Sequence, residues 1–479
     1  MLVRQTAYYM VAGVVSAILG LLSAVVFTRM LTPADYGVYI IGVSSAGIIS
    51  AILFTWLRYS ALRFQAEGGA VDIRATALLA YGLSALASPL AIAFLRLHSS
   101  VPVERASLAV LFALGLGLFE LGQELLKARL QTRAFVTAAI LRSLAAFALC
   151  LIAAWLGFGG LGQLAMAACA YFVTAAALGG QIWKGPLAPI DLGRLKTFAW
   201  LGAPMTVAGF VFAFHAALDR LFVAWWLGDS AAGLYGASAD LVRQMILLPA
   251  SSVAAATIPL AIRAYTSEGP AATRLQLQKG AELLLAILLP SVVGLALVSP
   301  YLAELILGPA FRATAVQIMP ILAFAWLFQS MSQSYVHTSF HLAKRPELNV
   351  AHALATLFLN VLIIGPMINA FGLLGAAGSL AISEALGFVV GVGLTRRAHP
   401  LPLIPGPATR VAMATAFMGL TIYQLERLMP GKDAGAFAIV VAGGVGAYAL
   451  ACLAMDVFGC RAFVERLANR GPLATAAST

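Results

Sequence analysis

Charged residues are scarce in this chain, and their scarcity excludes a soluble globular fold. Of the 479 residues, 10% are charged and 61% are hydrophobic, and the mean hydropathy is +0.93. Soluble globular domains have about 25% charged residues. The composition instead predicts an integral membrane protein, because apolar runs of about 20 residues cross a bilayer as helices. The two-residue alternation that barrel strands would show is missing.

The short motifs of enzymes are missing as well. The sequence has no glycine loop followed by Lys and Ser or Thr, no His and Glu pattern for a metal, and no Ser, His and Asp grouping. We therefore expect no catalysis, no cofactor, no metal site and no ATP-driven motor in the chain itself. The four cysteines stand singly in apolar runs, which indicates packing rather than disulfide or metal bonds. They are Cys150, Cys169, Cys452 and Cys460.

The positive charge of the chain follows a membrane topology. A net charge of +11 and a pI near 9.7 could suggest nucleic acid, but the basic residues lie at the ends of apolar runs, so we expect no nucleic-acid partner. Most basic residues between the runs fall on the side of Met1, which predicts that both termini are cytoplasmic. The pattern predicts fourteen spans, near residues 6–28, 37–57, 75–95, 106–126, 134–156, 160–182, 198–226, 232–262, 280–307, 312–340, 349–370, 373–395, 408–428 and 434–457.

One segment at the end of an apolar run occurs twice. Residues 27–39 are repeated by residues 223–235, and the residues that correspond are Leu31, Gly37 and Tyr39 in the first copy and Leu227, Gly233 and Tyr235 in the second. The second copy begins six spans after the first, and six is even, so both copies enter the membrane from the same side. They therefore predict parallel repeats related by an axis along the membrane normal.

The expected fold is all-α and integral to the membrane. It has fourteen transmembrane helices, which form two parallel six-helix lobes and two extra C-terminal helices. We place the N-terminal lobe at residues 1–196 and the C-terminal lobe at 197–399. Residues 400–479 form a proline-rich linker, the last two helices and a cytoplasmic tail.

Three segments resemble those of a known family: residues 29–39, residues 219–228 and residues 233–239. With the fourteen-span plan, they make the chain similar to the polysaccharide transporter family, the bacterial lipid-linked oligosaccharide flippases of the multidrug/oligosaccharidyl-lipid/polysaccharide superfamily. The resemblance implies a V-shaped pair of lobes around a cavity in the bacterial inner membrane. It also implies alternating access that moves an undecaprenyl-pyrophosphate-linked repeat unit to the periplasmic leaflet for capsule, exopolysaccharide or O-antigen assembly. Membrane lipid surrounds such a protein, and a polysaccharide polymerase is a candidate partner.

Three arginines inside spans are candidates for binding the substrate. Ionisable groups in hydrocarbon tend to face a cavity or a partner, and guanidinium matches phosphate oxygens with two parallel hydrogen bonds. The candidates are Arg142, Arg220 and Arg243. The alternative is pairing within the membrane, because Asp240 is three residues from Arg243 and Asp219 adjoins Arg220. Arg142 has no acidic residue within one helical turn and is the best candidate for an uncompensated charge.

Three acidic residues are candidates for coupling transport to H⁺ or Na⁺. Glu120 and Glu124 share a helical face, and two close carboxylates disfavour double ionisation. Their alternative role is a helix-end network with Lys127. Glu384 has no basic neighbour along its helix, and its alternative role is a contact to another helix.

Span ten is rich in hydrogen-bonding side chains. Those proposed for substrate binding are Gln329, Gln333 and His337, and serines and a further histidine lie around them. Helix packing by small polar residues is the alternative.

Three other classes of protein compete with the flippase interpretation. A peptidoglycan precursor flippase would also have fourteen spans and a basic cavity, and a cation-driven multidrug exporter usually has twelve spans. A polysaccharide polymerase or ligase would carry a large periplasmic loop, and no connection here is long enough.

Overall fold

The computed structural model of the chain describes residues 2–67, 72–99, 101–429 and 431–461. Every regular element in these ranges is a helix, which confirms the predicted all-α class. The predicted cytoplasmic tail lies largely in residues 462–479, outside the described residues. Packing divides the chain into a first unit, Met1–Leu241 with Ile306–Thr314 and Ile364–Ala376, and a second unit, Val242–Leu305 with Ala315–Ile363 and Ala377–Thr479. The lobe boundaries at residues 196 and 399 stay a prediction.

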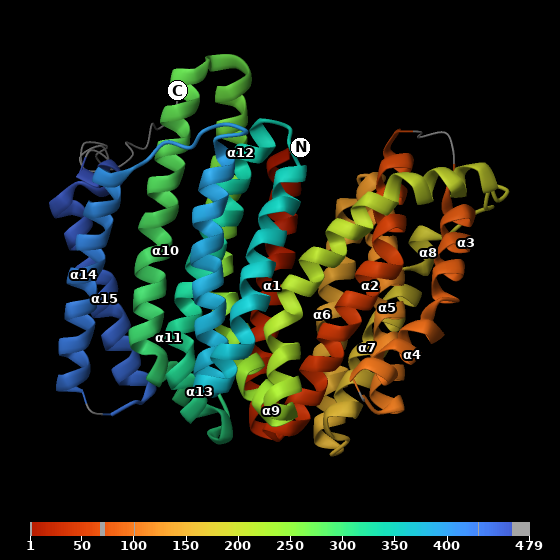
Figure 1. The fold of residues 1–479 in the computed structure, drawn as a ribbon, viewed down its shortest axis with the longest axis horizontal. Helices are drawn as coiled ribbons and strands as arrows, with labels where there is room; N and C mark the ends of the chain where they lie inside the picture. Colours follow the sequence, from red (N-terminus) through yellow and green to blue (C-terminus); the bar gives the residue numbers. More distant parts are fainter. Residues whose placement is uncertain (1, 68–71, 100, 430, 462–479) are drawn as a thin grey trace, which may run out of the picture. The chain divides into compact units, whose positions relative to one another are not determined.

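The first unit is a bundle in which α5 packs against α2 and α7, while α6 packs against α7 and α1 (Figure 1). Its buried core includes Leu57, Leu121, Leu125 and Phe198. Its helices are α1 (Leu2–Met30), α2 (Pro33–Glu67), α3 (Arg74–Ala85), α4 (Ser88–Ser99), α5 (Val103–Ala128), α6 (Thr132–Trp155), α7 (Gly159–Ala177), α8 (Gly179–Ile182) and most of α9 (Leu192–Arg263).

The second unit has a separate core, in which α14 and α15 pack together and against α10. The Tyr448 hydroxyl donates a 2.6 Å hydrogen bond to the Ala286 carbonyl and fixes α15 to α10. Its elements are the end of α9, the short π-helix η1 (Ala264–Glu268), nearly all of α10 (Pro270–Ile306), α11 (Pro309–Met331) beyond Thr314, the short π-helix η2 (Ser332–Val336), α12 (His337–Leu342), the two ends of α13 (Glu347–Thr395), α14 (Pro405–Leu428), α15 (Ala434–Met455) and the 3₁₀ turn η3 (Val457–Gly459).

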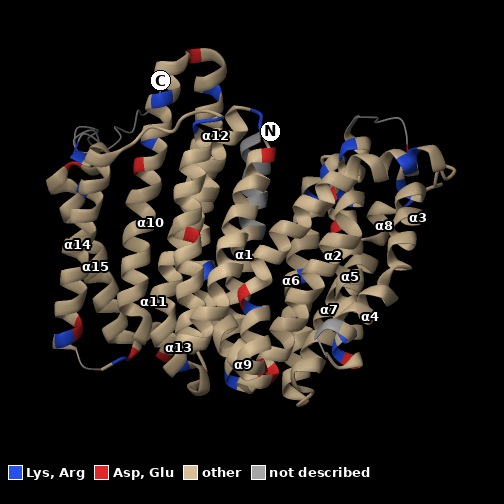
Figure 2. Cartoon of the chain, viewed as in Figure 1, with Lys and Arg blue, Asp and Glu red and all other residues tan. Residues whose placement is uncertain are grey.

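The helices are those of a multi-pass membrane protein. Eleven stretches of the described chain are long and apolar enough to cross a membrane, and the charged residues gather mostly at helix ends (Figure 2). Two of these stretches contain a break, at Gly228 of α9 (φ 84°) and at Gly372 of α13 (φ 58°), where the sequence predicts short connections. Glycine adopts such positive φ angles because it has no Cβ. The helix α14 is not among the eleven, so the number fourteen stays a prediction.

The predicted span at residues 75–95 lies within one of the eleven spanning stretches, Arg74–Leu97, but this stretch consists of two helices rather than one. The helix α3 ends at Ala85, and α4 begins at Ser88 after a turn. Pro89 explains the break, since its ring would clash with the carbonyl of Ala85 four residues earlier and it has no N–H to donate.

The two copies of the repeated segment cross each other within the first unit. A Cβ atom on Gly37 would lie 1.8 Å from the Asp229 carbonyl oxygen, and one on Gly233 would lie 2.0 Å from the Pro33 carbonyl oxygen. Gly37 corresponds to Gly233 and Pro33 to Asp229, so the contact is reciprocal. Only residues without side chains allow helix backbones to approach so closely.

Side chains on the neighbouring helices hold this crossing in place. The hydroxyl of Thr32 donates to Asp35 (2.6 Å) and accepts from the Asp35 backbone N–H (3.1 Å), which caps the start of α2. Asp35 also accepts a hydrogen bond from the backbone N–H of Gly160 at the start of α7. Arg105 of α5 binds both carboxylate oxygens of Asp229 at 2.9 and 2.6 Å.

An ion pair anchors the connection after α8 to the start of α3. The Arg74 side chain binds both carboxylate oxygens of Asp72 and donates to the carbonyls of Ile182, Lys184 and Pro186. The hydrogen bonds from Arg74, helped by the backbone N–H groups of Arg74 and Ala188, lower the pKa of Asp72 to about 2. The ionised carboxylate therefore stabilises the folded state.

Asp72→Asn is expected to lower the free energy of unfolding at neutral pH by about 1–2 kcal/mol, less than the full pKa shift implies because solvent screens the pair. The pKa is lower in the folded state, so this stabilisation is complete above the unfolded value, about 4, and is lost as the pH falls toward about 2. Unfolding curves in detergent at several pH values measure the difference. A difference that did not shrink in acid would show that the Asp72 charge is not its source.

Candidate functional site

Arg58, Glu120 and Arg142 form a charged cluster in the first unit. Arg58 Nη1 of α2 lies 2.6 Å from Glu120 Oε2 of α5. The Arg142 guanidinium of α6 donates to Ser143 Oγ at 2.9 Å and lies 5.5 Å from the ring centroid of Tyr171 on α7. Within the described ranges, Arg142 has no carboxylate at salt-bridge distance. Its guanidinium contacts an aromatic face and a hydroxyl, and Glu120 acts on it only at longer range, so it stays available to an anion.

The other acidic residue predicted on α5 has a local partner. Glu124 Oε1 lies 2.8 Å from Lys127 Nζ, one turn along the same helix. This is the helix-end pairing that the sequence left open as an alternative. Glu120 and Glu124 are therefore each held by a separate cation.

Arg220 pairs with Asp240, which the sequence suggested as a partner of Arg243. The two side chains lie on the two parts of α9, before and after the break at Gly228, and form a direct hydrogen-bonded ion pair. Tyr36 and Tyr235 are within electrostatic range of this pair. The pair therefore joins the two parts of α9 inside the first unit.

Arg243, the third arginine candidate, belongs to the second unit. Its guanidinium lies 5.4 Å from the ring centroid of Trp326 on α11. The structure thus divides the three predicted arginines between the two units, each beside a different stabilising group.

The polar residues of span ten lie around the short π-helix η2 in the second unit. Gln329 Nε2 donates to Glu384 Oε1 at 3.3 Å, and Glu384 is only 1% exposed. This contact between α11 and α13 is the alternative role that the sequence left open for Glu384. The buried hydroxyls of Ser330 and Ser332 have no hydrogen-bond partner in the described part of the chain. Because single-turn π-helical segments within α-helices are frequent at functional sites, η2 and its polar flank belong to the candidate site.

A histidine pair follows η2. His337 Nε2 and His352 Nδ1 are 3.2 Å apart, and His352 Nε2 is 3.0 Å from the Gly387 carbonyl oxygen. A carbonyl only accepts, so His352 carries its proton on Nε2 and accepts from His337 Nε2. A Cβ on Gly391 would lie 2.9 Å from the His352 ring, so α13 needs glycine there. Gln333, in contrast, is exposed.

Sequence reasoning did not single out Arg58, Tyr171 or His352. Arg58 lies just outside the predicted span at residues 37–57, whereas the helix α2 in the structure continues to Glu67. The uninterrupted run of helix-forming residues after Arg58 could have indicated the longer helix. His352 and Tyr171 are single polar residues in apolar runs, and the sequence offers no sign of their partners on other helices.

A chain of apolar spanning helices with few internal charges has the architecture of a multi-pass membrane protein, and comparison with solved structures shows which fold it has. The fold is similar to "Lipid II flippase MurJ, inward closed conformation", with a TM-score of 0.77, 14% identity, and coverage of 95% of this chain and 99% of that one. It is also similar to an inward-facing multidrug resistance MATE family transporter of the MOP superfamily, with a TM-score of 0.61, 15% identity, and coverage of 82% and 94%. These similarities show a MOP-type fold.

The chain belongs to the polysaccharide biosynthesis protein family, whose family model matches residues 71–336, more than half of its length. The resemblance to polysaccharide transporters of this superfamily is thereby confirmed. A comparison with curated proteins found no match. The matched range includes Arg142, Arg220 and Arg243 but not the first copy of the repeat.

Proposed function

We propose that the protein moves an undecaprenyl-pyrophosphate-linked oligosaccharide repeat unit from the cytoplasmic to the periplasmic leaflet of the bacterial inner membrane. Membership of the polysaccharide biosynthesis family supports the pathway, and the MOP-type fold supports alternating access. The observation that carries the substrate class is Arg142, a cation inside a spanning helix with no carboxylate at salt-bridge distance among the described residues. A pyrophosphate is an anion that such a guanidinium binds well.

The remaining predicted residues complete this proposal. Further substrate contacts are assigned to Arg220, Arg243, Gln329, Gln333 and His337. Coupling to H⁺ or Na⁺ is assigned to Glu120, Glu124 and Glu384, and the burial of Glu384 beside an amide supports its inclusion. We further propose that both termini are cytoplasmic and that the product passes to a polysaccharide polymerase.

Arg142→Ala is expected to reduce polysaccharide export about tenfold or more without loss of protein from the membrane. Removing the guanidinium removes charge-assisted hydrogen bonds to the pyrophosphate, which contribute about 1.5–3 kcal/mol in proteins. The measurement is surface polysaccharide in a deletion strain that expresses the variant at the wild-type level. Arg133→Ala is the matched control, because Arg133 is exposed at the start of the same helix. Equal export by the two variants would remove Arg142 from the site.

Depletion of the protein separates the proposed function from its rivals. We expect viable cells that lack the surface polysaccharide. Lysis with accumulation of cell-wall precursor would instead indicate a peptidoglycan precursor flippase. Drug hypersensitivity with normal polysaccharide would indicate a multidrug exporter.

A further inference from the structure

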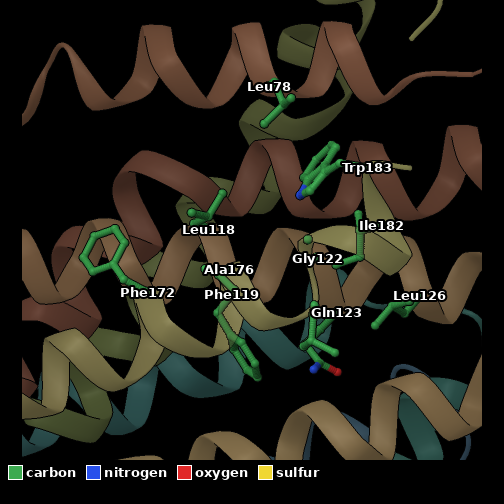
Figure 3. Close-up of a pocket in the computed structure, with 13 residues that line it drawn as sticks. Leu78, Leu118, Phe119, Gly122, Gln123, Leu126, Phe172, Ala176, Ile182 and Trp183 are labelled. Atoms are coloured by element: carbon green, nitrogen blue, oxygen red, sulfur yellow. The ribbon is translucent and has the colours of Figure 1, made fainter. Parts of the chain in front are cut away.

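The first unit contains a cavity of about 460 Å³ between α3, α5, α7 and α8 (Figure 3). Its walls are almost entirely apolar and include Leu78 of α3, Phe119 and Leu126 of α5, Phe172 of α7 and Trp183 after α8. None of the residues predicted to bind substrate or ions lines it. Its volume is in the range of small-molecule sites, about 300–1,000 Å³.

The position of the walls limits what can occupy this cavity. The helices α3, α5 and α7 lie in stretches that are apolar enough to span a membrane. A polar ligand in such walls would lose its hydration and find few hydrogen-bonding side chains, chiefly the amide of Gln123, which is unpaired in the part of the chain that the structure describes. Its burial is therefore unfavourable. A hydrocarbon chain has no hydrogen bonds with water to lose, and it gains close contacts with the Leu, Phe and Trp side chains.

One end of the cavity is positively charged. The carbonyl oxygen of Ile182, a lining residue, accepts hydrogen bonds from Arg74 Nη1 at 3.2 Å and from Arg129 Nη1 at 3.3 Å. Lys184 follows two residues later. Asp72 forms a salt bridge with Arg74 and acts on Arg129 only at longer range. Neither Arg129 nor Lys184 has a carboxylate at salt-bridge distance within the described ranges. Burial and the nearby charge of Arg74 lower the pKa of Arg129, as expected where positive charge is concentrated.

We propose that this cavity binds one acyl chain of an anionic phospholipid, whose phosphate lies at Arg129 and Lys184. The charged end faces the side that the distribution of basic residues predicts to be cytoplasmic, and anionic lipids attract such residues there. The site needs only the membrane location of the chain, so it is independent of which substrate the protein moves.

A pair of adjacent glycines gives a matched test of the cavity. Gly179 lines the cavity, and a Cβ there meets only Trp183 Cδ1 at 3.8 Å, so Gly179→Leu fills the space without backbone strain. Gly180 is exposed, does not line the cavity and has nothing within 4 Å of its Cβ position, so Gly180→Leu is the control. The full chain is reconstituted in nanodiscs of equal parts phosphatidylcholine and phosphatidylglycerol, and retained lipid is counted by native mass spectrometry.

We expect Gly179→Leu to retain at least about fivefold less phosphatidylglycerol than wild type, and Gly180→Leu to retain the wild-type amount. Equal retention by the two variants, whether high or low, would overturn the assignment of the cavity. Arg129→Gln combined with Lys184→Gln is expected to keep a bound lipid but lose the preference for phosphatidylglycerol over phosphatidylcholine. A preference that survived this double substitution would overturn the assignment of the phosphate.

Discussion

Gly37→Ala is expected to abolish transport and to destabilise the protein, although alanine favours helices more than glycine does. The added Cβ would lie 1.8 Å from the Asp229 carbonyl oxygen. Backbone atoms cannot swing aside as a flexible side chain does, so α2 and the second part of α9 must separate. Overpacking costs about 1–3 kcal/mol, and a clash with backbone belongs at the upper end, about 3 kcal/mol. Thermal unfolding in detergent and polysaccharide export measure the two effects.

The same helix supplies the control. Gly47 also lies in α2, and a Cβ there would have nothing within 4 Å. Gly47→Ala is therefore expected to raise stability by up to about 1 kcal/mol through helix propensity alone. Because the crossing is reciprocal, Gly233→Ala should behave like Gly37→Ala. Unfolding curves and export that were the same for Gly37→Ala and Gly47→Ala would refute the tight crossing.

Asp240→Leu is expected to be the most destabilising substitution of a single charged residue discussed in this protein. It leaves the Arg220 guanidinium, whose side chain is 14% exposed, without its carboxylate inside the helix bundle. Loss of one partner of a fully buried pair costs about 3–5 kcal/mol, and the 37% exposure of Asp240 reduces the expected cost to about 2–3 kcal/mol. The free energy of unfolding in detergent measures this cost.

A double substitution separates pairing from substrate binding. Arg220→Met combined with Asp240→Leu removes both charges, so we expect it to recover most of the stability that Asp240→Leu loses. Export should stay low in the double variant if Arg220 also contacts the substrate. If Asp240→Leu were as stable as wild type, the ion pair would contribute nothing to the free energy of unfolding, which is true of many exposed ion pairs. Full export by the double variant would exclude Arg220 from the site.

The fold class was predictable because it depends on composition and on the lengths of apolar runs. The breaks at Gly228 and Gly372 were predictable as well, since glycine interrupts each run near its middle. The turn between α3 and α4 was not predicted, because hydropathy continues through it and Pro89 acts only on the backbone. The sequence therefore shows where the chain is apolar better than where its helices stop.

It was harder to predict which residues of the candidate site contact each other than to predict which residues belong to the site. Arg220 and Asp240 are 20 residues apart and lie ten residues on either side of Ser230, so an antiparallel turn brings them opposite each other. Reasoning from the sequence considers only neighbours within about one helical turn and therefore suggests other partners. The same limit concealed the contacts of Arg58 with Glu120 and of Gln329 with Glu384, which join separate helices.

The reciprocal crossing of Gly37 and Gly233 also bears on the ancestry of the chain. Before a duplication joined the halves, one gene product would have formed this contact with a second copy of itself across a twofold axis. Each mutation would then have changed both sides of the contact. Fusion would have removed that constraint. Pro33 and Asp229 now differ at equivalent positions, and only Asp229 can bind Arg105. If the predicted duplication occurred, the asymmetry between the two copies of the segment is younger than the contact, and a search for further divergence should begin at corresponding positions of the crossing.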